Sequence, residues 1–148
     1  MDIADLETQQ KRLIFAQFSE ATALELGLAL VTLAKAGQLP VAINIRTPDR
    51  TLFHASMPGA TPLNDLWARR KSNTALIFQA ASMLVTLRLR DKPGGWERNG
   101  FAAADFALSG GSVPIRVQGI GVIGAVTVSG LPEAEDHALV VQAIESLL

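Results

Sequence analysis

The stretch GGSVPIRVQGIGVIGAVTVSG, residues 110–130, decides the fold class. Two runs rich in valine and isoleucine, residues 113–118 and 120–129, flank a short turn that contains glycine. Valine and isoleucine favour strands, and two such runs around a short turn are typical of a β-hairpin. The sequence therefore predicts an antiparallel pair of strands in its C-terminal third.

A second hairpin is predicted upstream, from residues 41–46 and 51–55, because a turn signal at 48–50 separates two runs that favour strands. Residues 106–108 are predicted to add a short fifth strand. The sequence thus predicts an antiparallel sheet of five strands.

Helices account for most of the remaining chain. They are predicted for residues 3–18, 20–36 and 62–80 from helical spacing and capping residues, and for the C-terminal segment that follows 130–132. Residues 82–91 alternate basic and apolar side chains, which fits a strand or a helix; a helix is favoured, ending at the Pro-Gly-Gly run 93–95. Helices on the faces of an antiparallel sheet define the α+β class.

Composition indicates one domain, residues 1–148, that assembles with copies of itself. The chain has 148 residues, of which 49% are hydrophobic and only 18% charged, against roughly 25% charged in an average soluble protein. The surplus apolar surface points to a subunit interface, and the N-terminal segment 1–18 is a candidate oligomer contact.

Charge and cysteine content exclude several function classes. Thirteen basic residues balance fourteen acidic ones, which argues against binding to nucleic acid or to an anionic membrane through overall charge. The sequence has no cysteine, which removes disulfides and thiolate metal sites. Neither an export signal nor a membrane-spanning segment is visible, so a cytoplasmic location is expected.

Residues 119–124 match the GxGxxG string of dinucleotide-binding folds. That fingerprint must open a helix, whereas the residues after it continue as a predicted strand. These glycines are therefore assigned to a tight hairpin turn.

The run WARRK, residues 67–71, places three cations on successive helical positions. At about 100° per residue they cannot all point into one site. Arg70 or Lys71 could bind a ligand carboxylate or phosphate, with Arg46 and Arg116 on neighbouring strands, and the alternative is an exposed helix face.

Candidates for proton transfer or iron ligation are the two histidines, His54 and His137, because their ordinary pKa lies near neutrality. Met57 is a further soft ligand candidate. Glu135 and Asp136 precede His137, although acids in the first turn of a helix also simply complement its dipole. No spacing typical of a metalloenzyme occurs.

Several of these motifs together resemble the haem-degrading-domain superfamily, which includes GlcG-like and HbpS-like proteins and the C-terminal domain of PduO-type proteins. The resemblance rests on LFHA at 52–55, WARRK at 67–71, GGSVPI at 110–115, GAVTVSG at 124–130 and EDH at 135–137. It runs from about residue 20 to the C-terminus and is closest to a branch of uncharacterised single-domain proteins. The positions that match recurring family residues are Phe53, His54, Arg70, Lys71, Gly111, Pro114, Gly130, Glu135 and Asp136.

The resemblance implies a profilin-like fold that assembles into dimers or larger rings, and haem binding or redox sensing as the functional theme. One hypothesis is therefore a homo-oligomer that binds an anionic, partly apolar small molecule such as haem, with Arg70 or Lys71 on its carboxylates and His54 as the candidate iron ligand. A second is an enzyme for a small carboxylated substrate, with His54 or His137 as base. A third is an oligomeric scaffold that binds other proteins.

Overall fold

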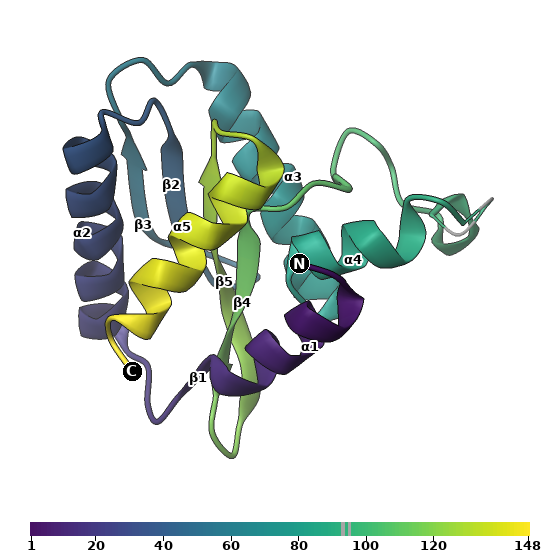
Figure 1. Cartoon of the computed structure of the whole chain (residues 1–148), viewed down its shortest axis with the longest axis horizontal. Coiled ribbons are helices and arrows are strands. Elements are labelled where there is room, and N and C mark those ends of the chain that lie inside the picture. Colours follow the sequence, from purple (N-terminus) through teal and green to yellow (C-terminus); the bar gives the residue numbers. More distant parts are fainter. Residues whose placement is uncertain (93, 95) are drawn as a thin grey trace.

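The structure, a computed structural model, describes residues 1–92, 94 and 96–148 (Figure 1). Within them, five strands form one sheet in the order β1-β4-β5-β2-β3. The strands are β1 (Ile14–Phe15), β2 (Ala42–Arg46), β3 (Thr51–Ser56), β4 (Ser112–Val117) and β5 (Gly121–Ser129). Neighbours pair antiparallel except β1 with β4, which are parallel. Both predicted hairpins and the α+β class are confirmed.

Helices cover both faces of the sheet. They are α1 (Ile3–Arg12), α2 (Glu20–Gly37), α3 (Pro62–Phe78), α4 (Ser82–Leu89) and α5 (Glu133–Glu145), with a short 3-10 turn, η1 (Glu97–Asn99). α2 and α5 pack on one face, α3 packs on the other, and α1 lies beside α4 and α5 (Figure 1). At the end of the sheet where β5 stops and β4 begins, no strand separates the two helical layers. Side chains of α3 and α5 therefore contact each other there.

Local sequence explains where the helices begin. The Ser19 hydroxyl accepts a hydrogen bond from the backbone N–H of Thr22, whose hydroxyl accepts one from the N–H of Ser19; this reciprocal capping box starts α2 as predicted. Pro62 occupies the first turn of α3, where its missing N–H costs nothing.

The fifth strand is not the predicted one. Ile14 and Phe15, assigned to the first helix by their spacing, leave it after Arg12 and pair with β4. Residues 106–108 are not a strand, because the Thr74 hydroxyl of α3 takes both the N–H and the carbonyl oxygen of Ala107. Residues 82–89 form a helix, as favoured. The Pro-Gly-Gly run 93–95 is predicted to end it, and positions 93 and 95 of that run lie outside the described residues.

The core lies mainly between the sheet and α2 and α5. Phe53 of β3 packs directly against Gly27 of α2, where a Cβ would collide with the ring. The sequence indicates that α2 is buried on several sides, yet in the single chain Leu24 and Leu28 are 53% and 52% exposed. Among the described residues, no helix is long and apolar enough to cross a lipid bilayer.

Candidate functional site

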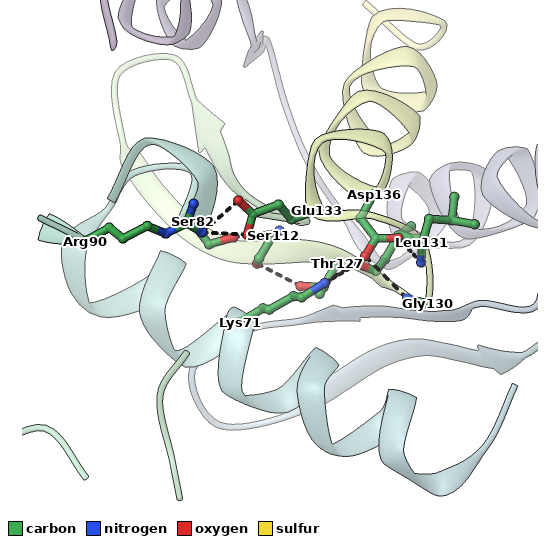
Figure 2. A network of polar contacts seen from close by, with 10 residues as sticks. Lys71, Ser82, Arg90, Ser112, Thr127, Gly130, Leu131, Glu133 and Asp136 are labelled. Carbon is green, nitrogen blue, oxygen red and sulfur yellow. Dashed lines mark hydrogen bonds and ion pairs between the residues drawn. The ribbon is translucent and has the colours of Figure 1, made fainter. Parts of the chain in front are cut away.

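Lys71 is a buried cation, although the sequence places it in a polar run. Its Nζ lies 2.8 Å from Oδ2 of Asp136 and 3.4 Å from the carbonyl oxygen of Val128, and its side chain is only 4% exposed (Figure 2). The pair joins α3 to α5, two helices on opposite faces, around the end of the sheet. An ion pair of this kind is strongly coupled, because each charge depends on the other in a medium of low polarity.

Asp136 is held by more than the lysine. Its carboxylate accepts hydrogen bonds from the backbone N–H groups of Leu131, at 2.9 Å, and Gly130, at 3.3 Å. Burial raises the pKa of Asp136, while Lys71 and these two N–H donors act to lower it. The carboxylate therefore fixes the loop between β5 and α5 as well as the lysine.

Gly111 allows the pair to approach the sheet. Its φ of +132° is in a region that favours glycine. A Cβ at this position would lie 2.5 Å from the Val128 carbonyl oxygen and 2.9 Å from the Lys71 Nζ. The close approach of the Lys71 ammonium to the backbone therefore requires glycine here.

A cavity of about 260 Å³ opens onto the ion pair. We call it the Lys71 cavity; its walls come from α3, from the loops beside Gly110 and Gly130, and from the start of α5. They are formed by Leu63, Asn64, Trp67, Lys71, Ser109, Ser129, Gly130, Leu131 and Asp136. Apart from the ion pair, these side chains are neutral, and they combine hydroxyl and amide groups with apolar surface. Residues from three of the motifs that carry the family resemblance thus surround one cavity.

A row of polar side chains runs across the sheet on the face that α3 covers, from buried Ser112 and Thr127 to exposed His54 at the edge. The register places Asn44 opposite both His54 and Thr127, and Thr127 opposite Ser112. The Thr127 hydroxyl donates to Ser112 Oγ at 2.7 Å (Figure 2). It also lies 2.8 Å from Ser72 Oγ of α3. The hydroxyl network of Ser72, Ser112 and Thr127 fixes how α3 sits on the sheet. The buried Oδ1 of Asn44, in the same row, has no hydrogen-bond partner among the described residues.

Sequence patterns do not predict this network, because Ser72, Ser112 and Thr127 belong to three different elements. The only available signal was a hydroxyl residue inside an apolar strand, at Thr127.

Arg69 and Arg70 bind the protein's own backbone. Arg69 contacts the Asp105 carboxylate at 3.2 Å and the carbonyl oxygen of Ala104 at 2.8 Å. Arg70 donates to the carbonyl oxygen of Phe106 and lies 4.3 Å above the Trp67 ring. Two of the three cations of the WARRK run therefore hold the 104–106 segment against α3.

His54 lies apart from the Lys71 cavity, on the exposed edge strand β3. Its Nε2 donates to the Asp65 carboxylate at 2.9 Å, and its Nδ1 accepts from the Asn44 amide at 3.0 Å. Both ring nitrogens therefore have partners. Its neighbour Phe53 packs on the opposite face of the sheet, against α2.

The other predicted site residues separate as well. His137 follows Asp136 on α5 but is buried against α1, where its Nε2 lies 2.7 Å from the Gln9 Oε1. Glu135 is exposed in the first turn of α5, and Pro114 is buried in β4. The structure thus brings Lys71, Asp136 and Gly111 together, and leaves the histidines and Glu135 elsewhere. No group of three or more histidine, aspartate or glutamate side chains suited to a metal ion occurs in the described part of the chain.

A family model and several known proteins match this sequence over most of its length. Residues 18–145 match the family model described as haem degrading protein HbpS-like. A UPF0303 protein of Streptomyces coelicolor is 46% identical over 147 residues, which cover 99% of this chain and 93% of the relative. The UPF0303 protein of Rhizobium rhizogenes is 47% identical over 97% of this chain and 88% of its own.

Solved structures extend the likeness to the fold. The crystal structure of the Ybr137w protein superposes with a TM-score of 0.89 at 30% identity, covering 98% of this chain and 87% of that one. A PduOC:haem complex superposes with a TM-score of 0.70 at 25% identity, covering 90% and 95%. The predicted superfamily is confirmed: the chain belongs to the HbpS-like family of haem-degrading proteins.

Proposed function

We propose that this chain is a homo-oligomeric binding protein for a small, anionic and partly apolar molecule, which it holds in the Lys71 cavity. The observation that carries the proposal is a buried ammonium at the wall of a cavity. An ammonium has three protons, and among the described residues Lys71 has two acceptors, Asp136 and the Val128 carbonyl oxygen. The third proton is available to a ligand carboxylate.

The rest of the cavity suits the same ligand. The carboxylate of Asp136 is offset by Lys71 and by two backbone donors, so it does not stand uncompensated against an anion. Ser109 and Ser129 supply hydroxyl groups, and Leu63 and Trp67 supply apolar surface at the wall. Binding sites of this type are mostly apolar with a few polar groups that fix orientation.

Haem is the leading named candidate, because of the family and because the PduOC neighbour is a complex with haem. The cavity fits one part of haem only. Its volume of about 260 Å³ can take a carboxylate arm but not the whole macrocycle, which would lie outside against Leu63. None of the lining residues offers an imidazole, thioether or thiolate to iron. His54 as an iron ligand stays a prediction.

A titration with haemin and with iron-free protoporphyrin IX tests the proposal. Because recognition is by carboxylate and apolar surface, both porphyrins are expected to saturate at one molecule per cavity with similar affinity. Leu63→Glu adds a negative charge at the cavity wall and is expected to weaken both by about tenfold, or about 1.4 kcal/mol. Leu66→Glu is the matched control, since Leu66 is exposed on the same helix and the same apolar surface but does not line the cavity, so an effect on assembly alone would appear in both variants.

Two results would contradict the proposal. One is binding of haemin without binding of protoporphyrin IX, which would place the affinity in the iron; the His54→Ala variant would then identify or exclude that ligand. The other is an equal response of the Leu63→Glu and Leu66→Glu variants.

Assembly is part of the proposal. Large apolar side chains are exposed on the single chain, on α2 at Leu24 and Leu28 and on α3 at Leu63, Leu66 and Ile77. Leu24 and Leu28 lie one helical turn apart, as do Leu63 and Leu66, so each pair forms an exposed apolar patch of the kind that favours association. Sedimentation of the purified protein measures the subunit number.

The enzyme hypothesis receives less support. It predicts that Arg70, His54 and Glu135 meet at one cavity. Instead, Arg70 binds the Phe106 carbonyl oxygen and His54 binds Asp65, and none of the three residues lines the Lys71 cavity. A scaffold role shares the exposed apolar surface but gives no account of a buried ammonium beside a cavity.

A further inference from the structure

A second cavity, of about 300 Å³, lies beneath α1, between α4 and α5. It is separate from the Lys71 cavity, because Asp136 and His137 point to different sides of α5. Its walls are largely apolar, and they gather an unusual set of donor atoms. Of the three methionines and two histidines in the chain, Met1, Met83 and His137 line this one cavity.

We propose that Met1, Met83 and His137 form a binding site for a soft monovalent metal ion, Cu(I). The site does not rest on the function proposed for the Lys71 cavity. Thioether sulfur and imidazole nitrogen are ligands that Cu(I) accepts, whereas harder ions prefer carboxylate and carbonyl oxygen.

His137 is prepared for this role by its burial. The residue is 3% exposed, and such burial disfavours the charged imidazolium. A metal ligand must be unprotonated, so the burial favours the form of the ring that can bind an ion. Its Nδ1 is buried and has no hydrogen-bond partner, so that only Nε2 is engaged within the described structure.

Gln9 of α1 lies between two of the donors. Its Oε1 is 2.7 Å from the Nε2 of His137, and its Nε2 is 4.0 Å from the Sδ of Met1. The carboxamide therefore occupies the position where an ion would meet both the imidazole and the thioether. Gln9 is half-buried at the edge of the molecule and can turn outward, and the ring proton of His137 then moves to Nδ1 as the ion takes Nε2.

Met83 supplies the third donor from α4. Gly110 leaves the space that its sulfur occupies, since a Cβ there would lie 2.5 Å from the Met83 Sδ. Methionine side chains are flexible and can close around an ion. Three donors, one from the segment before α1, one from α4 and one from α5, would thus tie these parts of the chain together when the ion binds.

A shortage of harder ligands makes the site selective, since Glu145 is the one carboxylate among the residues that line this cavity. Within the described residues, no group of three or more histidine, aspartate or glutamate side chains is arranged for a metal. Zn(II) and Mg(II) therefore lack the ligands that they need here. The proposal predicts that the protein distinguishes Cu(I) and its soft analogue Ag(I) from Zn(II).

The test is a titration of the full chain with Ag(I), which is stable in air, followed by competition for Cu(I) with a chromophoric chelator under anaerobic, reducing conditions. Met83→Leu keeps the side chain's size and removes the sulfur; it is expected to weaken binding by more than about tenfold. Met57→Leu is the matched control, because Met57 is the one methionine outside the cavity. NMR should show the Nε2 resonance of His137, and not that of His54, shifting as Ag(I) is added.

Gln9→Ala provides a second variant that does not alter a metal ligand. It removes the group that competes for His137, so it is expected to bind Ag(I) at least as tightly as the wild type. The proposal is overturned if Met83→Leu and Met57→Leu bind Ag(I) equally, if Zn(II) competes with Ag(I) at equal concentration, or if the His137 resonance does not move.

Discussion

Replacing Lys71 by methionine is expected to remove about 3 to 5 kcal/mol from the free energy of unfolding. The reason is the partner left behind: Asp136 is completely buried, and the variant takes away a cation 2.8 Å from its carboxylate. A domain typically has only about 5 to 15 kcal/mol in total. For a chain of this length the loss corresponds to a fall of about 6 to 20 °C in the unfolding temperature.

The double variant Lys71→Met/Asp136→Leu distinguishes the loss of the ion pair itself from the cost of leaving the Asp136 carboxylate buried without a cation. It removes both ions and leaves apolar side chains of similar size, so it is expected to recover most of the stability. Lys35→Met is the control for loss of a lysine, because Lys35 is exposed at the end of α2. Urea unfolding followed by circular dichroism measures all four proteins.

The effect should depend on pH in a defined direction. Burial raises the pKa of Asp136 in the folded protein above its ordinary value of 3.8, so the folded state binds the proton more tightly than the unfolded state. Stability from this group is therefore present at low pH and is lost as the pH rises through the folded-state pKa. Without Lys71 this loss should grow, and Lys71→Met should be closer to the wild type at pH 5 than at pH 7.5. The reasoning is refuted if the free energy of unfolding of Lys71→Met lies within about 1 kcal/mol of the wild-type value at pH 7.5, or if the double variant is no more stable than the single one.

Three further predictions concern single residues. Gly111→Ala should destabilise the protein by more than about 1 kcal/mol, measured by urea unfolding, because its Cβ meets a carbonyl oxygen, whereas Gly119→Ala at the open turn should cost less. His137, with a folded pKa of about 4 against 6.5 unfolded, contributes about 3 kcal/mol that is present above pH 6.5 and lost as the pH falls towards 4; His137→Phe should flatten that part of the pH–stability curve. Thr74→Val leaves the N–H and carbonyl oxygen of Ala107 unpaired and should cost about 1 to 3 kcal/mol, seen as a lower unfolding temperature.

Local patterns predicted the elements whose stability is local. The hairpins at residues 41–55 and 113–129 have their own turns, and α2 has its own capping residues, so nearby sequence suffices. Ile14 and Phe15 form a strand only because β4, a hundred residues later, offers a parallel partner. The spacing of apolar residues within 3–18 therefore cannot predict that pairing.

The candidate site could be predicted in part. Family motifs indicated Lys71, Gly111 and Asp136 one by one, but 65 positions separate the lysine from the aspartate. The WARRK run looks like an exposed charged face, and no local rule says which of its cations turns inward. The hydrogen bonds that occupy His54 also come from side chains on other elements, Asn44 and Asp65, which sequence alone does not bring together.

The most direct test of the proposed binding function is a crystal structure of the protein with protoporphyrin IX. We predict a porphyrin carboxylate within hydrogen-bonding distance of the Lys71 Nζ and the ring against Leu63 and Trp67, with the Lys71–Asp136 pair still formed. A porphyrin bound at another surface, with the Lys71 cavity containing only solvent, would contradict the account.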